Sequence, residues 1–154
     1  MKKKKNMQTE KVYLWEDEVI QPRSKRLLSF NEAQSFVNGV WLAHGWLYPP
    51  EVTPLHANTR VHIGRGCRHG IQIHGKRKTP AWVLVHEIAH ALTDDNHGPN
   101  FVGMYIKLLE KTLDIPVLLS IYSLNEWKIK FNLAVKPAML DPDWPIEFPM
   151  GASK

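Results

Sequence analysis

The feature that most constrains this chain is an apolar segment in which two histidines stand four residues apart. His86 and His90 enclose Glu87. Apolar residues recur around them at helical spacing: Trp82, Leu84, Val85, Ile88, Ala91 and Leu92. This periodicity predicts a helix, and residues four apart on a helix share one face. Thr79 is the expected N-cap and Pro80 the expected first helical residue, with the end of the helix near Leu92.

Two imidazoles one helical turn apart can bind a single metal ion. Neutral histidine suits zinc, with nitrogen-to-metal distances of about 2.0–2.1 Å, and histidine is largely neutral near pH 7. Glu87 directly follows the first histidine, so its carboxylate can reach water beside the ion without binding the ion. There it can accept a proton from water and later return it to a leaving group. We therefore predict His86 and His90 as Zn²⁺ ligands and Glu87 as the catalytic base and acid.

A catalytic zinc ion requires a third protein ligand and an open position. Asp94, Asp95 and His97 follow the motif closely, and we favour His97 as the third metal ligand. The loop before it is long enough to reverse the chain, and Gly98 permits a close backbone approach. A helix that begins at Pro99 disfavours imidazolium at its start. Either aspartate is then available to accept the second ring N–H of a ligand histidine.

The segments upstream of the motif predict a strand and a second helix. Residues 11–15 are rich in β-forming residues and predict a first strand. Ser29 and Glu32 have the spacing of a capping box, which marks the start of a helix. That helix is expected to end near His44, where Gly45 can adopt a left-handed conformation.

The rest of the chain predicts a short pair of strands and further helices. Alternation of apolar and polar residues predicts half-buried strands at Arg60–Ile63 and Gly70–His74. A helix is expected over residues 99–113. Ser123 and Glu126 form a second capping box, although the residues after it alternate as they would in a strand. We favour a helix there because of the cap.

Length and composition predict one folded domain. The chain has 154 residues, of which 44% are hydrophobic, and we assign the domain to residues 11–135. A flexible basic tail is expected over residues 1–10 and a Pro-rich extended tail over residues 136–154. No apolar run approaches the roughly 18 residues of a membrane-spanning helix, and a signal peptide is not expected. Cys67 is the only cysteine, which excludes an internal disulfide and favours a cytoplasmic location.

The net charge of +5 raises the question of a nucleic-acid partner. Much of the excess lies in Lys2–Lys5, and a second basic run spans Lys76–Lys78. Nucleic-acid interfaces usually concentrate charge on one folded face, whereas isolated runs of lysine are usually solvated. Nucleic acid therefore remains an alternative partner that we do not favour, and no membrane partner is expected.

The segment from His86 to Leu92, followed by His97-Gly98-Pro99-Asn100-Phe101, resembles zincin-type metallopeptidases. It is similar in particular to SprT-like proteins and to small bacterial and phage metallohydrolase families with an HExxH…HGPxF pattern. The resemblance covers about residues 60–123. It implies an α+β, zincin-like fold in which a small twisted sheet packs against the HExxH helix beside further helices. It also implies a bacterial cell, or one infected by a phage, as the setting.

The same resemblance implies a site and a substrate. His86, His90 and His97 would hold Zn²⁺, and Glu87 would be the catalytic acid and base. Gly70–His74 would be an edge strand along which a protein or peptide substrate binds by strand addition. SprT-type proteins often continue into a Cys-rich zinc ribbon that contacts DNA, and this chain has no cysteine there. DNA-linked proteolysis is therefore disfavoured.

Two functions from different classes follow from this sequence. The first is a zinc-dependent metallopeptidase, for which Tyr122 is a candidate stabiliser of an oxyanion near the metal. The alternative is a non-catalytic, zinc-stabilised binding module that contacts a protein partner or nucleic acid. The alternative predicts a closed site in which Asp94 or Asp95 supplies a fourth ligand.

Overall fold

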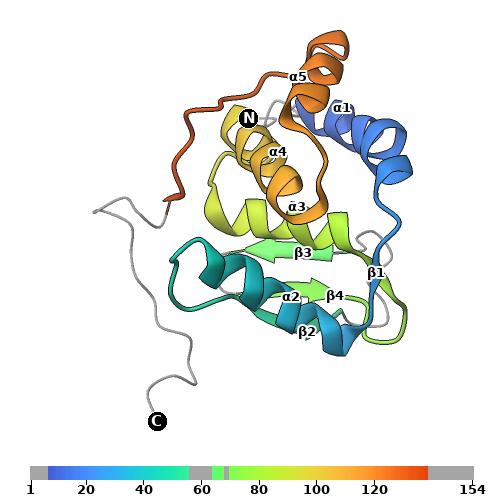
Figure 1. Ribbon diagram of the computed structural model, residues 1–154, viewed down its shortest axis with the longest axis vertical. Coiled ribbons are helices and arrows are strands. Elements are labelled where there is room, and N and C mark those ends of the chain that lie inside the picture. Colours follow the sequence, from blue (N-terminus) through green and yellow to red (C-terminus); the bar gives the residue numbers. More distant parts are fainter. Residues whose placement is uncertain (1–6, 56–63, 68–69, 139–154) are drawn as a thin grey trace, which may run out of the picture.

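Helices packed on small sheets make up the described part of the chain, which is α+β (Figure 1). The structure is a computed structural model that describes residues 7–55, 64–67 and 70–138. The α-helices are α1 (Met7–Trp15), α2 (Phe30–Ala43), α3 (Ala81–Leu92), α4 (Pro99–Leu113) and α5 (Val117–Glu126). A π-helical turn, η1 (Glu16–Ile20), and a 3-10 turn, η2 (Gln21–Arg23), follow α1. The strands are β1 (Leu27–Leu28), β2 (Glu51–Pro54), β3 (Gly64–Cys67), β4 (Gly70–Ile73) and β5 (Thr79–Pro80).

The larger sheet has the strand order β2-β4-β3. β4 pairs in parallel with β2 and antiparallel with β3. The strand predicted at Gly70–His74 is confirmed over Gly70–Ile73, where Ile71 and Ile73 are buried and Gln72 is half-buried. The prediction that it is an edge strand is wrong, because both of its sides carry ladder hydrogen bonds. The strand predicted at Arg60–Ile63 lies outside the described residues.

Helix α3 lies at the centre of the fold. It runs beside β3 and packs against α4 on another side (Figure 1). Every residue of α3 except His90 is buried, so the helix is covered nearly all round, as expected for a core helix. This packing gives the segment that carries His86 and Glu87 a fixed position.

The start of α3 differs from the prediction. Thr79 does not cap the helix, because β5 pairs with β1 and Pro80 occupies the N-cap position without a side-chain cap. The Ala81 N–H instead donates to the carbonyl oxygen of Arg26 at 2.9 Å. The predicted end of the helix at Leu92 is confirmed.

Helix α2 confirms the signals read at both of its ends. Ser29 is the N-cap, and both hydrogen bonds of its capping box with Glu32 are present. Gly45, two residues after Ala43, has a φ of 76°, the left-handed conformation that glycine adopts without a Cβ penalty.

The strand predicted at residues 11–15 is wrong, because this segment belongs to helix α1. Val12 and Trp15 are buried, and their separation of three residues places them on one helical face. Packing of that face outweighs the β-propensity of the segment. The Trp15 indole N–H donates to Ser123 Oγ at 2.9 Å, which joins α1 to α5 (Figure 1). Helix α1 begins at Met7, earlier than the predicted domain start at residue 11.

The C-terminal prediction also needs correction. Helix α5 begins after Pro116, and Ser123 lies inside it, where the Ser123 hydroxyl donates to the carbonyl oxygen of Ser120. The second capping box is therefore not a helix start. Residues 127–138 form neither an α-helix nor a β-strand. Within the described ranges, no helix combines the length and apolar character needed to cross a membrane.

Candidate metal centre

Three histidines converge at one point between α3 and α4. His86 and His90 lie one turn apart on α3, and His97 comes from the loop before α4. Their Nε2 atoms lie 3.1 Å apart for His86 and His90, 3.1 Å for His90 and His97, and 3.3 Å for His86 and His97. The structure thus brings together all three predicted ligands.

The geometry of this cluster fits a small tetrahedral cation. Bonds of about 2.0–2.1 Å at tetrahedral angles separate two ligand nitrogens by about 3.3–3.4 Å, close to the separations observed. A neutral imidazole has one N–H and one acceptor nitrogen, and three Nε2 atoms aimed at one point do not satisfy one another by hydrogen bonding. His86 and His97 are buried and His90 is half-buried, so His90 is the member of the histidine cluster that keeps some exposure to solvent.

A buried carboxylate orients the first of these ligands. His86 Nδ1 donates to Glu16 Oε2 at 2.7 Å, and the Tyr105 hydroxyl donates to the same oxygen at 2.8 Å. Glu16 is 2% exposed. The Nδ1–H of His86 is therefore committed to Glu16, which leaves the lone pair of Nε2 for a cation.

The sequence assigned this orienting role to Asp94 or Asp95, and the structure contradicts that assignment. Asp95 accepts the N–H groups of Asn100 and Phe101 at 2.7 and 2.9 Å and so caps the start of α4. Asp94 is exposed. Glu16 could not have been found from spacing, because it lies 70 residues before His86. The one indication of its role in the sequence is that this glutamate directly follows a tryptophan, Trp15, which is buried in the structure.

The prediction that Gly98 permits a close backbone approach is confirmed. A Cβ at Gly98 would lie 2.5 Å from Asp95 Oδ2 and 2.9 Å from the carbonyl oxygen of Asp95, so a larger residue would require this loop to shift. Gly98 therefore allows the Asp95 carboxylate to reach the start of α4 while His97 turns toward the histidine cluster. The carbonyl oxygen of His97 also accepts from Gln8 Nε2 at 3.0 Å, which ties the loop to α1.

The electrostatics of the cluster favour one positive charge. Burial lowers the pKa of His90 to about 2, with help from the positive charges of His86 and His97. Burial and the charge of His86 lower the pKa of His97 to about 4. Burial opposes charge on His86, but Glu16, by charge and hydrogen bond, and Glu87 raise the pKa of His86 above its ordinary value. Two imidazoles thus remain neutral, and the carboxylates attract a single cation, either a proton or a metal ion.

Glu87 lies beside the cluster and is buried. Its negative charge helps to raise the pKa values of His86, Tyr13 and Tyr105. Glu87 follows His86 directly in α3, so its carboxylate adds negative charge to the surroundings of the histidine cluster.

Aromatic rings enclose the histidines. The fully buried Phe101 stacks on His90 with ring centroids 4.3 Å apart and meets His86 and His97 edge-on. Tyr13 of α1 lies parallel to His86, with centroids 6.1 Å apart, and edge-on to His97 at 5.0 Å. Tyr13 was not predicted as a site residue, because a strand at residues 11–15 gave no reason to place it near the histidines.

Tyr122 has a different environment from the one predicted. It is 70% exposed on α5, and no hydrogen bond or ring contact between described residues joins it to the three histidines. Its exposure gives no support to the predicted role as an oxyanion stabiliser.

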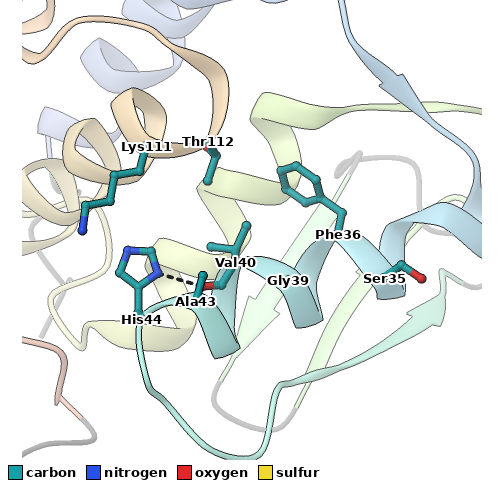
Figure 2. Close-up of a pocket in the computed structure, with 8 residues that line it drawn as sticks. All are labelled: Ser35, Phe36, Gly39, Val40, Ala43, His44, Lys111 and Thr112. Atoms are coloured by element: carbon teal, nitrogen blue, oxygen red, sulfur yellow. Dashed lines mark hydrogen bonds between the residues drawn. The ribbon is translucent and has the colours of Figure 1, made fainter.

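A groove elsewhere on the molecule does not include the histidine cluster. It lies between α2 and α4 and has a volume of about 510 Å³. Figure 2 shows His44 and Lys111 on the two helices that face it, with the His44 Nδ1–H donating to the carbonyl oxygen of Val40. His44 also stacks on Trp46, which gives this histidine a structural role.

Comparisons with known proteins found no matching family model, no matching curated protein and no matching solved structure. The resemblance to zincin-type and SprT-like proteins therefore gains no support from them.

Proposed function

We propose that this protein is a metal-dependent hydrolase that cleaves peptide bonds. One observation carries the proposal: three histidine Nε2 atoms converge within 3.1–3.3 Å beside the buried carboxylate of Glu87. His86, His90 and His97 would hold the ion, and Zn²⁺ is the metal that three imidazoles suit best. Among the described residues, the group of side chains that could hold a metal ion consists of these three histidines. Three protein ligands are the number typical of a catalytic zinc site, whereas a closed structural site has four.

Each residue then has a distinct task. A bound zinc-type ion supplies Lewis acidity, which polarises a carbonyl group and makes water more acidic. Glu87 accepts a proton from the attacking water and passes it to the departing amine. Glu16 holds His86 in the tautomer that binds metal. His90 is half-buried, and Tyr13 beside His86 and His97 is partly exposed, so a substrate would approach the cluster from this part of the surface.

A peptide substrate is favoured by the position of β3. Among the described strands, β3 pairs with β4 on one side only, and it runs next to α3 (Figure 1). An extended chain can add to such an edge by backbone hydrogen bonds. We therefore move the proposed substrate-binding edge from Gly70–His74 to Gly64–Cys67.

The alternative of a zinc-stabilised binding module requires a fourth protein ligand. Asp95 is occupied at the start of α4 and Asp94 is exposed, so neither aspartate is placed with the histidine cluster. This arrangement favours the hydrolase over the binding module.

The test compares the zinc-loaded wild type with Glu87→Gln on a dye-labelled unfolded protein. We expect equal zinc content and a loss of cleavage of about 100-fold or more in Glu87→Gln, because a general base contributes about 10²–10⁴-fold. Glu126→Gln, an exposed glutamate on α5, is the matched control and should cleave normally. Equal activity of Glu87→Gln and wild type, both fully loaded, would refute the role of Glu87. No cleavage by the loaded wild type would refute the proposed function.

A further inference from the structure

Tyr13 is the solvent-facing member of the aromatic group around the histidines. Phe101 and Tyr105 are fully buried, whereas Tyr13 is 42% exposed. Tyr13 nevertheless contacts two of the three candidate ligands, His86 and His97. A substrate that reached the cluster from solvent would therefore meet Tyr13, while the other two rings are covered by protein.

Several contacts fix the position of Tyr13. Val12 and Trp15, on either side of it in α1, are completely buried. Trp15 is hydrogen-bonded to Ser123, and Gln8 Nε2 donates to the carbonyl oxygens of His97 and Lys130. A side chain on a helix anchored in this way keeps a precise position relative to a site.

The phenol of Tyr13 lies beside the histidine cluster and is a hydrogen-bond donor. A tyrosine hydroxyl has an ordinary pKa of about 10, so it is protonated at neutral pH and can donate a hydrogen bond. The Tyr13 ring centroid lies 6.1 Å from that of His86 and 5.0 Å from that of His97, which places the phenol at the edge of the histidine cluster.

We propose that Tyr13 donates a hydrogen bond to the substrate carbonyl oxygen as that oxygen gains negative charge. This inference rests on the proposed function. The role of Tyr13 would add to the proposed hydrolase a catalytic residue from helix α1, which is far in sequence from the histidine motif. A donor placed where charge develops stabilises the transition state more than the ground state.

A conservative substitution distinguishes the effect of the Tyr13 hydroxyl from that of its ring. Tyr13→Phe keeps the ring contacts with His86 and His97 and removes the hydroxyl alone. Tyr122→Phe makes the same chemical change at an exposed position and is the matched control. We expect Tyr13→Phe to keep wild-type zinc content and thermal unfolding, with kcat lowered by about 10-fold or more and KM changed little, because one oxyanion donor is worth about 10²–10³-fold in favourable cases.

A binding measurement gives a readout that does not depend on turnover. N-phosphoryl-Leu-Phe, a phosphoramidate dipeptide, places tetrahedral anionic oxygens where the substrate carbonyl would become anionic. Calorimetric titration of the zinc-loaded proteins should show binding to Tyr13→Phe that is weaker by about 10-fold or more than binding to wild type and to Tyr122→Phe.

The possible results distinguish the two proposals. Wild-type binding and turnover by Tyr13→Phe, with Glu87→Gln inactive, would overturn the role of Tyr13 and leave the hydrolase intact. Loss of zinc from Tyr13→Phe would also overturn the donor role, because the hydroxyl would then be needed to hold the ligands. A loaded wild type that neither cleaves nor binds the phosphoramidate would overturn both.

Discussion

Replacement of Glu16 by glutamine tests whether this distant carboxylate tunes the candidate metal centre. Glu16 Oε2 accepts from both His86 Nδ1 and the Tyr105 hydroxyl, at 2.7 and 2.8 Å. The carbonyl oxygen of glutamine can take the same place, so shape and both hydrogen bonds can persist. The negative charge is lost, and with it the attraction that makes His86 a better ligand for a cation.

The expected magnitude follows from the role of Glu16. Orienting partners of metal-ligating histidines typically contribute 10–100-fold to metal affinity, or about 1.4–2.7 kcal/mol. Glu16 is nearly completely buried, so solvent does not screen its charge and we expect the upper part of this range. Glu16→Ala would cost more, because it also leaves the buried donors of His86 and Tyr105 without an acceptor.

The assay is competition for zinc against a coloured chelator at fixed pH and salt. Glu18→Gln is the matched control: it removes the same charge from the same π-helical turn, but Glu18 is exposed. We expect Glu16→Gln to bind zinc about 10–100-fold more weakly and Glu18→Gln to bind it as wild type does. Equal zinc affinity of Glu16→Gln and Glu18→Gln would refute the orienting role of Glu16.

Two further predictions concern stability. In the metal-free protein, the pKa values of His90 and His97 are lower in the folded state than in the unfolded chain. Below about pH 6.5 the unfolded chain therefore binds more protons at these two residues, and the stability of the fold falls as pH falls. The raised pKa of His86 acts in the opposite direction. Urea unfolding should show a net decrease in the free energy of unfolding from pH 7 to pH 5, with at most about 2 kcal/mol from each of His90 and His97. Greater stability at pH 5 than at pH 7 would contradict this. Gly103→Ala in α4 should destabilise the fold by about 1–3 kcal/mol or more, because the added Cβ would overlap the carbonyl oxygen of Asn132. Gly39→Ala in α2 meets nothing within 4 Å and should be neutral or slightly stabilising, so equal effects of the two substitutions would show that the packing at Gly103 is described wrongly.

The parts of the fold that follow local rules could be predicted. Helix α2 has its capping box and its glycine end, and α4 begins at Pro99 as expected. The three histidines were also predictable, because a four-residue spacing on a helix and a short following loop place them together. In each case the residues that determine the structure lie within a few positions of one another.

The parts that depend on distant contacts could not be predicted. Residues 11–15 favour a strand by composition, yet burial of Val12 and Trp15 against other helices makes them helical. Tyr13 of α1 and Glu16 of η1 reach the site only because these two elements pack there. The central place of β4 depends on pairing with β2 and β3, which no local pattern specifies.

X-ray absorption spectroscopy at the zinc edge, on purified protein loaded with one equivalent of zinc, tests the central claim most directly. We predict one ion per chain with three imidazole nitrogens at about 2.0–2.1 Å, and a loss of imidazole scattering in His97→Ala. Failure to retain stoichiometric metal, or a zinc environment without histidine that is unchanged in His97→Ala, would contradict it.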